Sequence, residues 1–553
     1  MVREIYTSLK KPDSFTGKLR IWAQKNIKLL DSTILSFAVI ISWSLTGPKS
    51  GMGYETSLIN YSNENSFLGG FIFVDPLRPF TSFSYHAANL FSKFFFQSGF
   101  FGIQIVFCLL LVIRVLMFYS LIVAIFPTNR GLAITSSVIF SVYSADGATF
   151  WVGQMNQIAC STAALMSLFY LAKCCRFDEP IPRNSSLSLS LVFQFYSLWS
   201  YEAILLPLSL AGIIIIFYLS TKKILKYWLI VLWLSLPVAY GITFLMSTIV
   251  NLDSYRASLI DPQLDVYKFF RNVIIELKMG LDPFQWFITL NETHLGSIIF
   301  GLVISICLAL YVYITTKEEK KVLESIQPAA WKMYFLILMI TVSNLLPFAI
   351  STSALGLWRT HLIAAIPFSL LMGYFFLNQF NLIPTARTFM FLFYALVLLA
   401  SSITLHERGI KHESDWRLQQ NVARNLIKTA PCPPQDSNVI LVLPKDVSTG
   451  GSLQSPFGDN LWFEQMLKLA YPNKNIKGFY ISNDGVLPPG VSAGSINSGA
   501  VTLIDGNSDE FSLLVKMPET GAILPKAKWR IIEKVNTSCE TPGQVKSMYL
   551  EFF

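Results

Sequence analysis

Carboxylates and guanidinium groups stand at the borders of the long apolar stretches of this chain. Glu55 and Asp75 follow the first stretch, Arg78 comes soon after Asp75, and Arg359 directly precedes the tenth. A carboxylate can take a proton from a hydroxyl group, and a guanidinium can neutralise a phosphate through paired hydrogen bonds. Ionisable groups at a membrane border are costly to desolvate, so these residues are candidate functional groups. Each also has a plain structural interpretation, because the ends of membrane spans meet water.

The composition of the chain predicts a membrane protein. Its 553 residues are 53% hydrophobic and only 14% charged, and the mean hydropathy is +0.49. Soluble proteins carry about 25% charged residues. We therefore expect an α-helical polytopic protein with about eleven transmembrane helices, although several apolar segments are shorter than the roughly 20 residues of a full crossing. The segments lie near residues 31–47, 100–125, 131–146, 153–172, 186–201, 203–219, 227–249, 294–315, 332–350, 360–378 and 386–404.

Lysines and arginines gather in alternate connections between the spans, which places these connections in the cytoplasm by the positive-inside rule. The N-terminus is then inside and the C-terminus outside. Residues 186–219 could instead form one overlong helix, which would invert everything downstream. Both flanks of this segment are basic, so we expect a re-entering pair that turns near Glu202 and Pro207. The basic residues are Lys18, Arg20, Lys25, Lys28, Arg130, Lys173, Arg176, Arg183, Lys222, Lys223, Lys226, Lys317, Lys320, Lys321 and Arg387.

This topology places most of the polar and ionisable residues on the outer side. That side receives the loops 48–98 and 250–293 and everything after about residue 405, and Asp146 and Glu202 end short spans there. The centres of the spans are expected to be free of ionisable groups, which argues against a transporter. All five histidines fall on the outer side or at its border: His86, His294, His361, His406 and His412.

The first outer loop and the spans after it contain the runs Gly53-Tyr54-Glu55, Asp75-Pro76-Leu77-Arg78-Pro79-Phe80, His86-Ala87-Ala88-Asn89-Leu90 and Trp151-Val152-Gly153-Gln154; Ser200-Tyr201-Glu202 and Arg359-Thr360-His361 follow. Over roughly residues 30–400 this pattern resembles the GT-C superfamily of polyprenyl-phosphate-dependent glycosyltransferases, and in particular the protein O-mannosyltransferases. In that family an acidic loop follows the first span. Many relatives have two adjacent acids there, whereas Glu55 stands beside Tyr54.

The resemblance implies an enzyme that moves a hexose or pentose from a polyprenyl-phosphate carrier to a glycan, lipid or protein acceptor on the outer side. One displacement with one base implies inversion at the sugar. Glu55 is the expected base, because it lies where the family places its acid, and Asp75 is the second candidate. A solvated loop carboxylate is the plain interpretation of Glu55, and Asp-Pro commonly opens a turn.

Arginines are the expected ligands of the donor phosphate. Arg359 is the first candidate, and Arg78 and Arg256 are the second candidates. Arg78 could instead pair with Asp75, and Arg359 could simply reach toward lipid head groups. His361, two residues after Arg359, is expected to contact the phosphate or the sugar.

Asp146, Glu202 and Trp151 are expected to face the same cavity, where either carboxylate could hold the acceptor hydroxyl or a metal ion. Capping a helix end explains Asp146 equally well. No two histidines have ligand spacing such as His-x-x-x-His, so no cofactor is expected to be required, although some GT-C enzymes use a divalent metal. The net charge of +9 lies mostly in the cytoplasmic connections, which predicts contact with membrane lipids and not with nucleic acid.

The composition changes after about residue 405, where the long apolar runs stop. We expect a cytoplasmic segment at 1–30, a transmembrane domain at 31–404 and a small extracytoplasmic α/β domain at 405–553. In that last domain the pattern predicts helices at 415–428 and 457–471 and strands at 438–443, 500–504 and 511–515. Cys432 and Cys539 could form its one disulfide in an oxidising compartment.

Two other functions remain open. A polysaccharide polymerase or ligase of the O-antigen type would share the compartment, but such proteins usually place a large basic outer loop late in the chain. A transporter or flippase for lipid-linked sugars would perform no chemistry. The expected location is a bacterial inner membrane.

Overall fold

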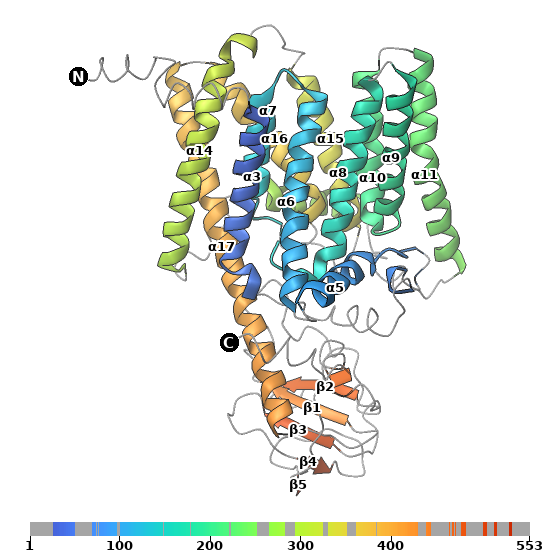
Figure 1. Cartoon of the computed structure of the whole chain (residues 1–553), viewed down its shortest axis with the longest axis vertical. Helices are drawn as coiled ribbons and strands as arrows, with labels where there is room; N and C mark the ends of the chain where they lie inside the picture. The colour runs from blue at the N-terminus through green and yellow to red at the C-terminus, as the bar shows by residue number, and fades with distance from the viewer. Residues whose placement is uncertain are drawn as a thin grey trace, which may run out of the picture.

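The computed structural model describes most of the first 429 residues and, beyond them, mainly five strands. The described residues are 26–49, 69–72, 75, 77–96, 100–146, 149–176, 179–220, 223–250, 265–281, 293–323, 330–350, 361–382, 384–429, 438–443, 464, 467–468, 471, 477–482, 501–505, 514–516 and 530–533. Figure 1 shows the long helices side by side in one bundle, with the strands beyond one of its ends. We call this end of the bundle the sheet end.

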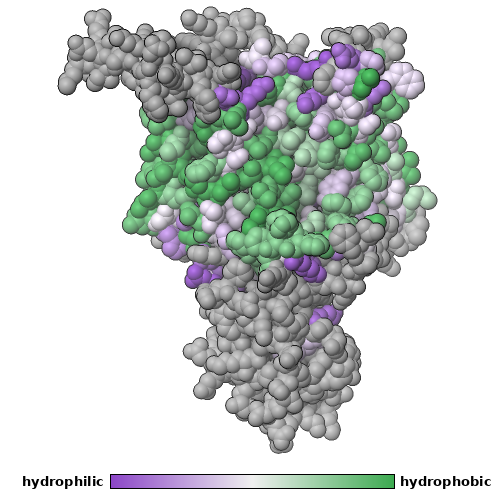
Figure 2. Space-filling view, viewed as in Figure 1, coloured by the Kyte–Doolittle hydropathy of each residue, from purple (hydrophilic) through white to green (hydrophobic). Residues whose placement is uncertain are grey.

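Each of the eleven predicted spans coincides with a helix. Eight described helices are long and apolar enough to cross a membrane, which confirms a helical multi-pass membrane protein. Figure 2 shows the hydrophobic residues as a broad green band over the middle of the bundle. The eleven helices are α3 (Ile27–Ser44), α6 (Phe100–Ile125), α7 (Arg130–Ser141), α8 (Met155–Arg176), α9 (Pro180–Leu198), α10 (Leu205–Leu219), α11 (Lys223–Val250), α14 (Leu295–Leu323), α15 (Ala330–Ala349), α16 (His361–Leu382) and α17 (Pro384–Thr429).

The re-entering pair predicted for residues 186–219 is confirmed, because α9 and α10 are separate helices. The buried face of α9 carries small polar residues that let it approach α8 closely. Ser167 and Ser190 donate to each other's carbonyl oxygens at 2.7 and 2.8 Å, and Ser197 Oγ donates to Cys160 O at 3.0 Å. These serines lower the hydropathy of α9, so it is not among the eight apolar helices.

Helix α7 is shorter than predicted and ends inside the bundle. The expected span 131–146 is helical only to Ser141, so the 12-residue helix is about 18 Å long at 1.5 Å per residue. That length is about half of a full crossing. The residues that follow, through Asp146, are buried among the other helices. The chain thus carries irregular backbone within the bundle, where neighbouring helices can satisfy its polar groups.

A buried carboxylate joins four helices toward the opposite end of the bundle. Asp31 of α3 is fully buried and accepts two hydrogen bonds from Arg130 of α7, at 2.6 and 2.7 Å. Tyr119 of α6 donates to the same carboxylate at 2.5 Å, and Tyr311 of α14 also donates to it. Charge and hydrogen bonding are both satisfied here, which makes the burial of these groups tolerable.

Helix α17 continues far beyond the bundle. Residues 415–428 are helical as predicted, but they do not form a helix of their own: they belong to a single 46-residue helix that begins at Pro384. It runs from the bundle to the strands (Figure 1). Trp416 stacks near Phe100 at the start of α6, with ring centroids 5.6 Å apart.

The strands form one five-stranded sheet in the order β2-β1-β3-β4-β5. Strand β1 lies parallel to β2 and β3, whereas β4 pairs antiparallel with β3 and β5. The strand predicted at 438–443 is confirmed, and those at 500–504 and 511–515 overlap β3 and β4. The bounds are β1 (Asn438–Leu443), β2 (Lys477–Ser482), β3 (Val501–Asp505), β4 (Leu514–Lys516) and β5 (Arg530–Glu533).

Removing the carboxylate of Asp31 should destabilise the bundle. Asp31→Ala leaves the partly buried charge of Arg130 and the hydroxyls of two tyrosines without their shared partner. Breaking a fully buried ion pair costs about 3–5 kcal/mol, so this change should cost up to that much and the thermal unfolding midpoint in detergent should fall clearly. Lys28→Ala, a change at an exposed position on the same helix, is the control. It should change the free energy of unfolding by no more than about 0.5 kcal/mol and so leave the midpoint nearly unchanged. Equal midpoints for the two variants would contradict the structural role of Asp31.

Candidate functional site

A buried ion pair lies near the middle of the bundle. Arg114 Nη1 of α6 contacts Asp146 Oδ2 at 2.8 Å, and both side chains are 4% exposed. The rise per residue puts Arg114 about 16 Å from the Ile125 end of α6, and it puts the end of α7 about 16 Å from Arg130. The end of α6 and the start of α7 are joined by a short connection and lie at the same face of the bundle. The short α7 therefore ends at about the depth of Arg114, and Asp146 follows shortly after it.

Two arginines hold the irregular segment that follows α7. Arg114 Nη2 also donates to the carbonyl of Leu362 at the start of α16, and its guanidinium lies 4.8 Å from the centre of the Phe140 ring. Arg408 of α17 is buried and donates through Nη1 to the carbonyl of Ser144. Two buried cations therefore flank the carboxylate of Asp146. This arrangement favours an additional anion nearby.

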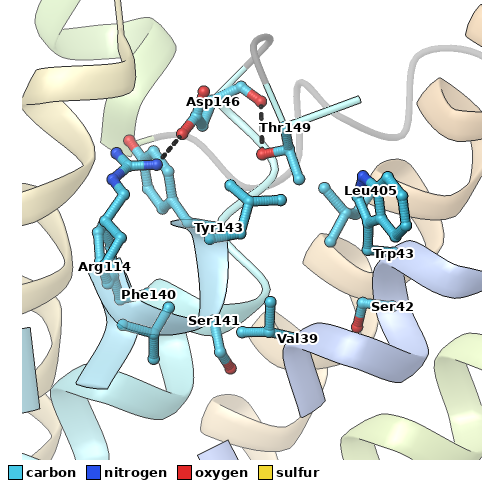
Figure 3. A pocket seen from close by; sticks show the side chains of 12 residues that line it. Val39, Ser42, Trp43, Arg114, Phe140, Ser141, Tyr143, Asp146, Thr149 and Leu405 are labelled. Atoms are coloured by element: carbon cyan, nitrogen blue, oxygen red, sulfur yellow. Dashed lines mark hydrogen bonds and ion pairs between the residues drawn. The ribbon is translucent and has the colours of Figure 1, made fainter. Parts of the chain in front are cut away.

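A pocket opens beside the ion pair. It is small, with a cavity volume of about 30 Å³, and it is partly open to solvent. Figure 3 shows Arg114 and Asp146 joined at one side of the pocket, with Thr149 donating to the Asp146 carbonyl at 3.4 Å. The lining comes from α3, α6, α7, the segment after α7 and α17: Val39, Ser42, Trp43, Leu111, Arg114, Val115, Phe140, Ser141, Tyr143, Asp146, Thr149 and Leu405.

Three lining residues carry a buried polar atom with no hydrogen-bond partner among the described residues. These atoms are Ser42 Oγ, Trp43 Nε1 and Arg114 Nε. An unsatisfied buried polar group costs about 1–3 kcal/mol, so such groups in a native protein call for an explanation. Two of the three are donors only. Trp43 Nε1 and Arg114 Nε would therefore need an acceptor as their partner.

A second ion pair joins the first described loop to the turn between α9 and α10. Arg78 Nε donates to Glu202 Oε2 at 2.5 Å, and Arg78 Nη2 also contacts the second carboxylate oxygen. The pKa of Arg78 is raised above its ordinary value: burial lowers it, but the charge and hydrogen bonds of Glu202 more than offset burial. The carboxylate partner of Arg78 is thus Glu202, whereas the sequence had suggested Asp75 as a possible partner.

Asp75 opens a turn. Its Oδ1 accepts from the Leu77 amide at 2.9 Å and its carbonyl accepts from the Arg78 amide at 3.0 Å. This is the local pattern by which aspartate opens turns. The turn-opening interpretation of Asp-Pro is therefore confirmed, while a catalytic role for Asp75 stays a prediction.

Asp146 and Glu202 pair with different arginines. The expectation that both lie at the outer surface is wrong for Asp146, which is buried at mid-bundle and held by Arg114. Glu202 begins the short helix η5 (Glu202–Ile204) and is held by Arg78. The two carboxylates thus belong to different ion pairs, while a cavity shared by both stays a prediction.

His361 is fully buried against α13 (Val266–Leu281). Its Nε2 lies 3.0 Å from the Glu276 carbonyl and 3.4 Å from the Glu276 carboxylate, which is fully buried too. Its contact with phosphate or sugar stays a prediction. Trp151 is also buried, and its carbonyl accepts from the Gln154 amide at 2.8 Å at the start of η4 (Val152–Gln154).

Several predicted site residues lie outside the described residues: Glu55, Arg256, Arg359, Cys432 and Cys539. Among the described residues, no group of three or more His, Cys, Asp or Glu side chains could hold a metal ion.

The sequence interpretation missed Arg114 and Arg408, and with them the pocket. The expectation that the span centres carry no ionisable group is wrong, because Arg114 lies in the middle of α6. A signal for it exists in the sequence. A lone arginine inside an otherwise apolar span requires a partner, and this requirement points to a functional or structural ion pair.

No family model and no curated protein matches this chain.

Asp146 and Arg114 should show strong energetic coupling. Asp146→Ala leaves the Arg114 charge buried without its partner, which costs about 3–5 kcal/mol, and the double variant Asp146→Ala with Arg114→Met removes that charge. The unfolding midpoint should therefore drop in the single variant and recover by half or more in the double variant. A double variant as unstable as the sum of its two singles would show that the residues do not interact.

Proposed function

We propose that this protein is a membrane glycosyltransferase that transfers a sugar from a polyprenyl-phosphate carrier to an acceptor hydroxyl. The observation that carries the proposal is the pocket at mid-bundle, where the donors Arg114 Nε and Trp43 Nε1 have no partner among the described residues. A phosphate supplies acceptor oxygens and negative charge for such donors. A lipid carrier can bring that phosphate to a site surrounded by apolar helices.

The proposed reaction is a single displacement. The acceptor oxygen forms a bond to the anomeric carbon of the sugar, and the bond from that carbon to the phosphate oxygen breaks. The electron pair of the broken bond leaves with the lipid phosphate, and the hydroxyl proton passes to a carboxylate. Cations near the leaving phosphate stabilise the charge that develops there.

The described contacts support different roles for the candidate residues. Arg114 is proposed to bind the donor phosphate through its Nε edge, while Asp146 holds the other edge of its guanidinium. A carboxylate in an ion pair with arginine is a weak base, because the pair favours its charged form. Glu55 therefore remains the proposed base. Arg359 and Arg256 remain proposed phosphate ligands.

The orientation in the membrane is part of the proposal. With the N-terminus in the cytoplasm, the sheet end of the bundle faces outward, and β1–β5 belong to an extracytoplasmic α/β domain. The alternating basic connections support this orientation. A bacterial inner membrane is the proposed location, and a metal ion is proposed not to be needed.

A transporter of lipid-linked sugars is the second candidate. Arg114 in the middle of α6 favours it, because an ionisable residue at mid-membrane is typical of substrate pathways. The same pocket would then bind the phosphate without transferring the sugar. No observation on the described residues favours a polysaccharide polymerase or ligase.

A transfer assay with the purified protein separates these functions. Glu55→Gln, Arg114→Lys and Lys28→Ala are compared with wild type in one detergent, using radiolabelled polyprenyl-phosphate sugars as donors. Loss of the base should lower the transfer rate about 10²-fold or more while donor binding persists. Arg114→Lys should weaken donor binding, because lysine offers no paired donors. Lys28→Ala should behave as wild type.

Donor binding without sugar transfer in the wild-type protein would contradict the glycosyltransferase. Movement of the labelled lipid across proteoliposomes in that case would establish the transporter. Full transfer by folded Glu55→Gln would exclude Glu55 as the base, and undiminished donor binding by folded Arg114→Lys would exclude the proposed phosphate site.

A further inference from the structure

Helix α5 (Phe83–Phe96) has the reverse of the usual distribution of residues in a soluble helix. Its buried face is rich in polar residues: Ser84, His86, Asn89 and Ser92 are all buried. Its exposed face is aromatic, and Phe94 and Phe95 are 75% and 70% exposed. A helix beside water places its polar face outward. An exposed face of this kind matches an apolar environment.

The orientation of α5 is fixed by close packing against α6. A Cβ atom on Gly102 of α6 would lie 2.7 Å from Ser92 Cα, so the two helices approach as closely as glycine permits. Tyr85 donates to the carbonyl of Gly153 before α8, which fixes the buried side of α5. The aromatic face therefore points away from the bundle.

The aromatic face of α5 continues into the apolar surface of α6. Phe96 packs edge-on against Phe101 of α6, with ring centroids 5.5 Å apart. Phe101, Leu109 and Ile113 of α6 are exposed, and α6 is one of the eight apolar helices long enough to span a membrane. The surface that faces lipid along α6 thus extends without interruption onto α5.

The position of α5 in the bundle suits the border of a membrane. Figure 1 shows α5 crossing the sheet end of the bundle, at the level where α6 begins. Lys93 is exposed immediately before the three phenylalanines. Aromatic rings with a flanking lysine are typical of the membrane interface, where the rings sit among lipids and the ammonium reaches the head groups.

We propose that α5 is an interfacial membrane helix that inserts Phe94, Phe95 and Phe96 into the lipid leaflet at the sheet end. The partner of this face is the lipid bilayer itself. The helix anchors the border of the bundle and separates the membrane from the sheet. This inference does not depend on the proposed glycosyltransferase activity.

Photocrosslinking in lipid nanodiscs tests the environment of α5. The photoreactive amino acid p-benzoylphenylalanine replaces Phe95 in the full-length protein, and mass spectrometry then measures phospholipid adducts on that residue. The replacement keeps an aromatic ring at an exposed position, so folding should be unaffected. The same substitution at Phe37 of α3, which is 61% exposed in a candidate span, is the positive control. Lys468, which is exposed in the chain between β1 and β2, is the negative control.

Phospholipid adducts at position 95 should match those at position 37 and exceed those at position 468 at least tenfold. Adducts at position 95 that are mainly to protein would show that another segment or a second copy covers the helix, which would overturn the proposal. A yield at position 95 as low as that at position 468 would place the helix in water and would overturn it equally.

Discussion

The need to compensate one arginine inside an apolar bundle explains much of this structure. Arg114 lies midway along α6, where its charge is almost entirely shielded from solvent. The half-length helix α7 ends at the same depth and supplies Asp146, and the start of α16 supplies the carbonyl of Leu362. Three helices are thereby positioned by one guanidinium. Arg408 of α17 secures the segment that carries Asp146.

The same arrangement creates the pocket that we associate with function. Because α7 stops short, the volume that its missing turns would fill is left to an irregular segment and a pocket between α3, α6, α7 and α17. The pocket retains polar atoms without partners among the described residues, beside two buried cations and one carboxylate. A site of this charge suits the phosphate of a lipid carrier, with the apolar helices around it suited to the lipid chain.

Apolar runs and turn chemistry predicted the helices well, whereas spatial pairing was not predictable. The spans, the re-entering pair α9 and α10 and the strand β1 all follow from local patterns. Arg114 and Asp146 are 32 residues apart, and Arg78 and Glu202 are 124 apart, so their partners depend on how helices pack. The end of α7 at Ser141 is also set by packing, since apolar residues continue beyond it.

The most direct test of this account compares the binding of a polyprenyl phosphate with that of the corresponding uncharged polyprenol to the wild-type protein in nanodiscs. The lipid chains are identical, so any difference reports the phosphate alone. We expect the phosphate to bind at least tenfold more tightly, a difference of about 1.4 kcal/mol or more, because it satisfies buried donors that the alcohol leaves largely unpaired. Equal affinities would show that the pocket beside Arg114 does not recognise a lipid phosphate, and would contradict the account.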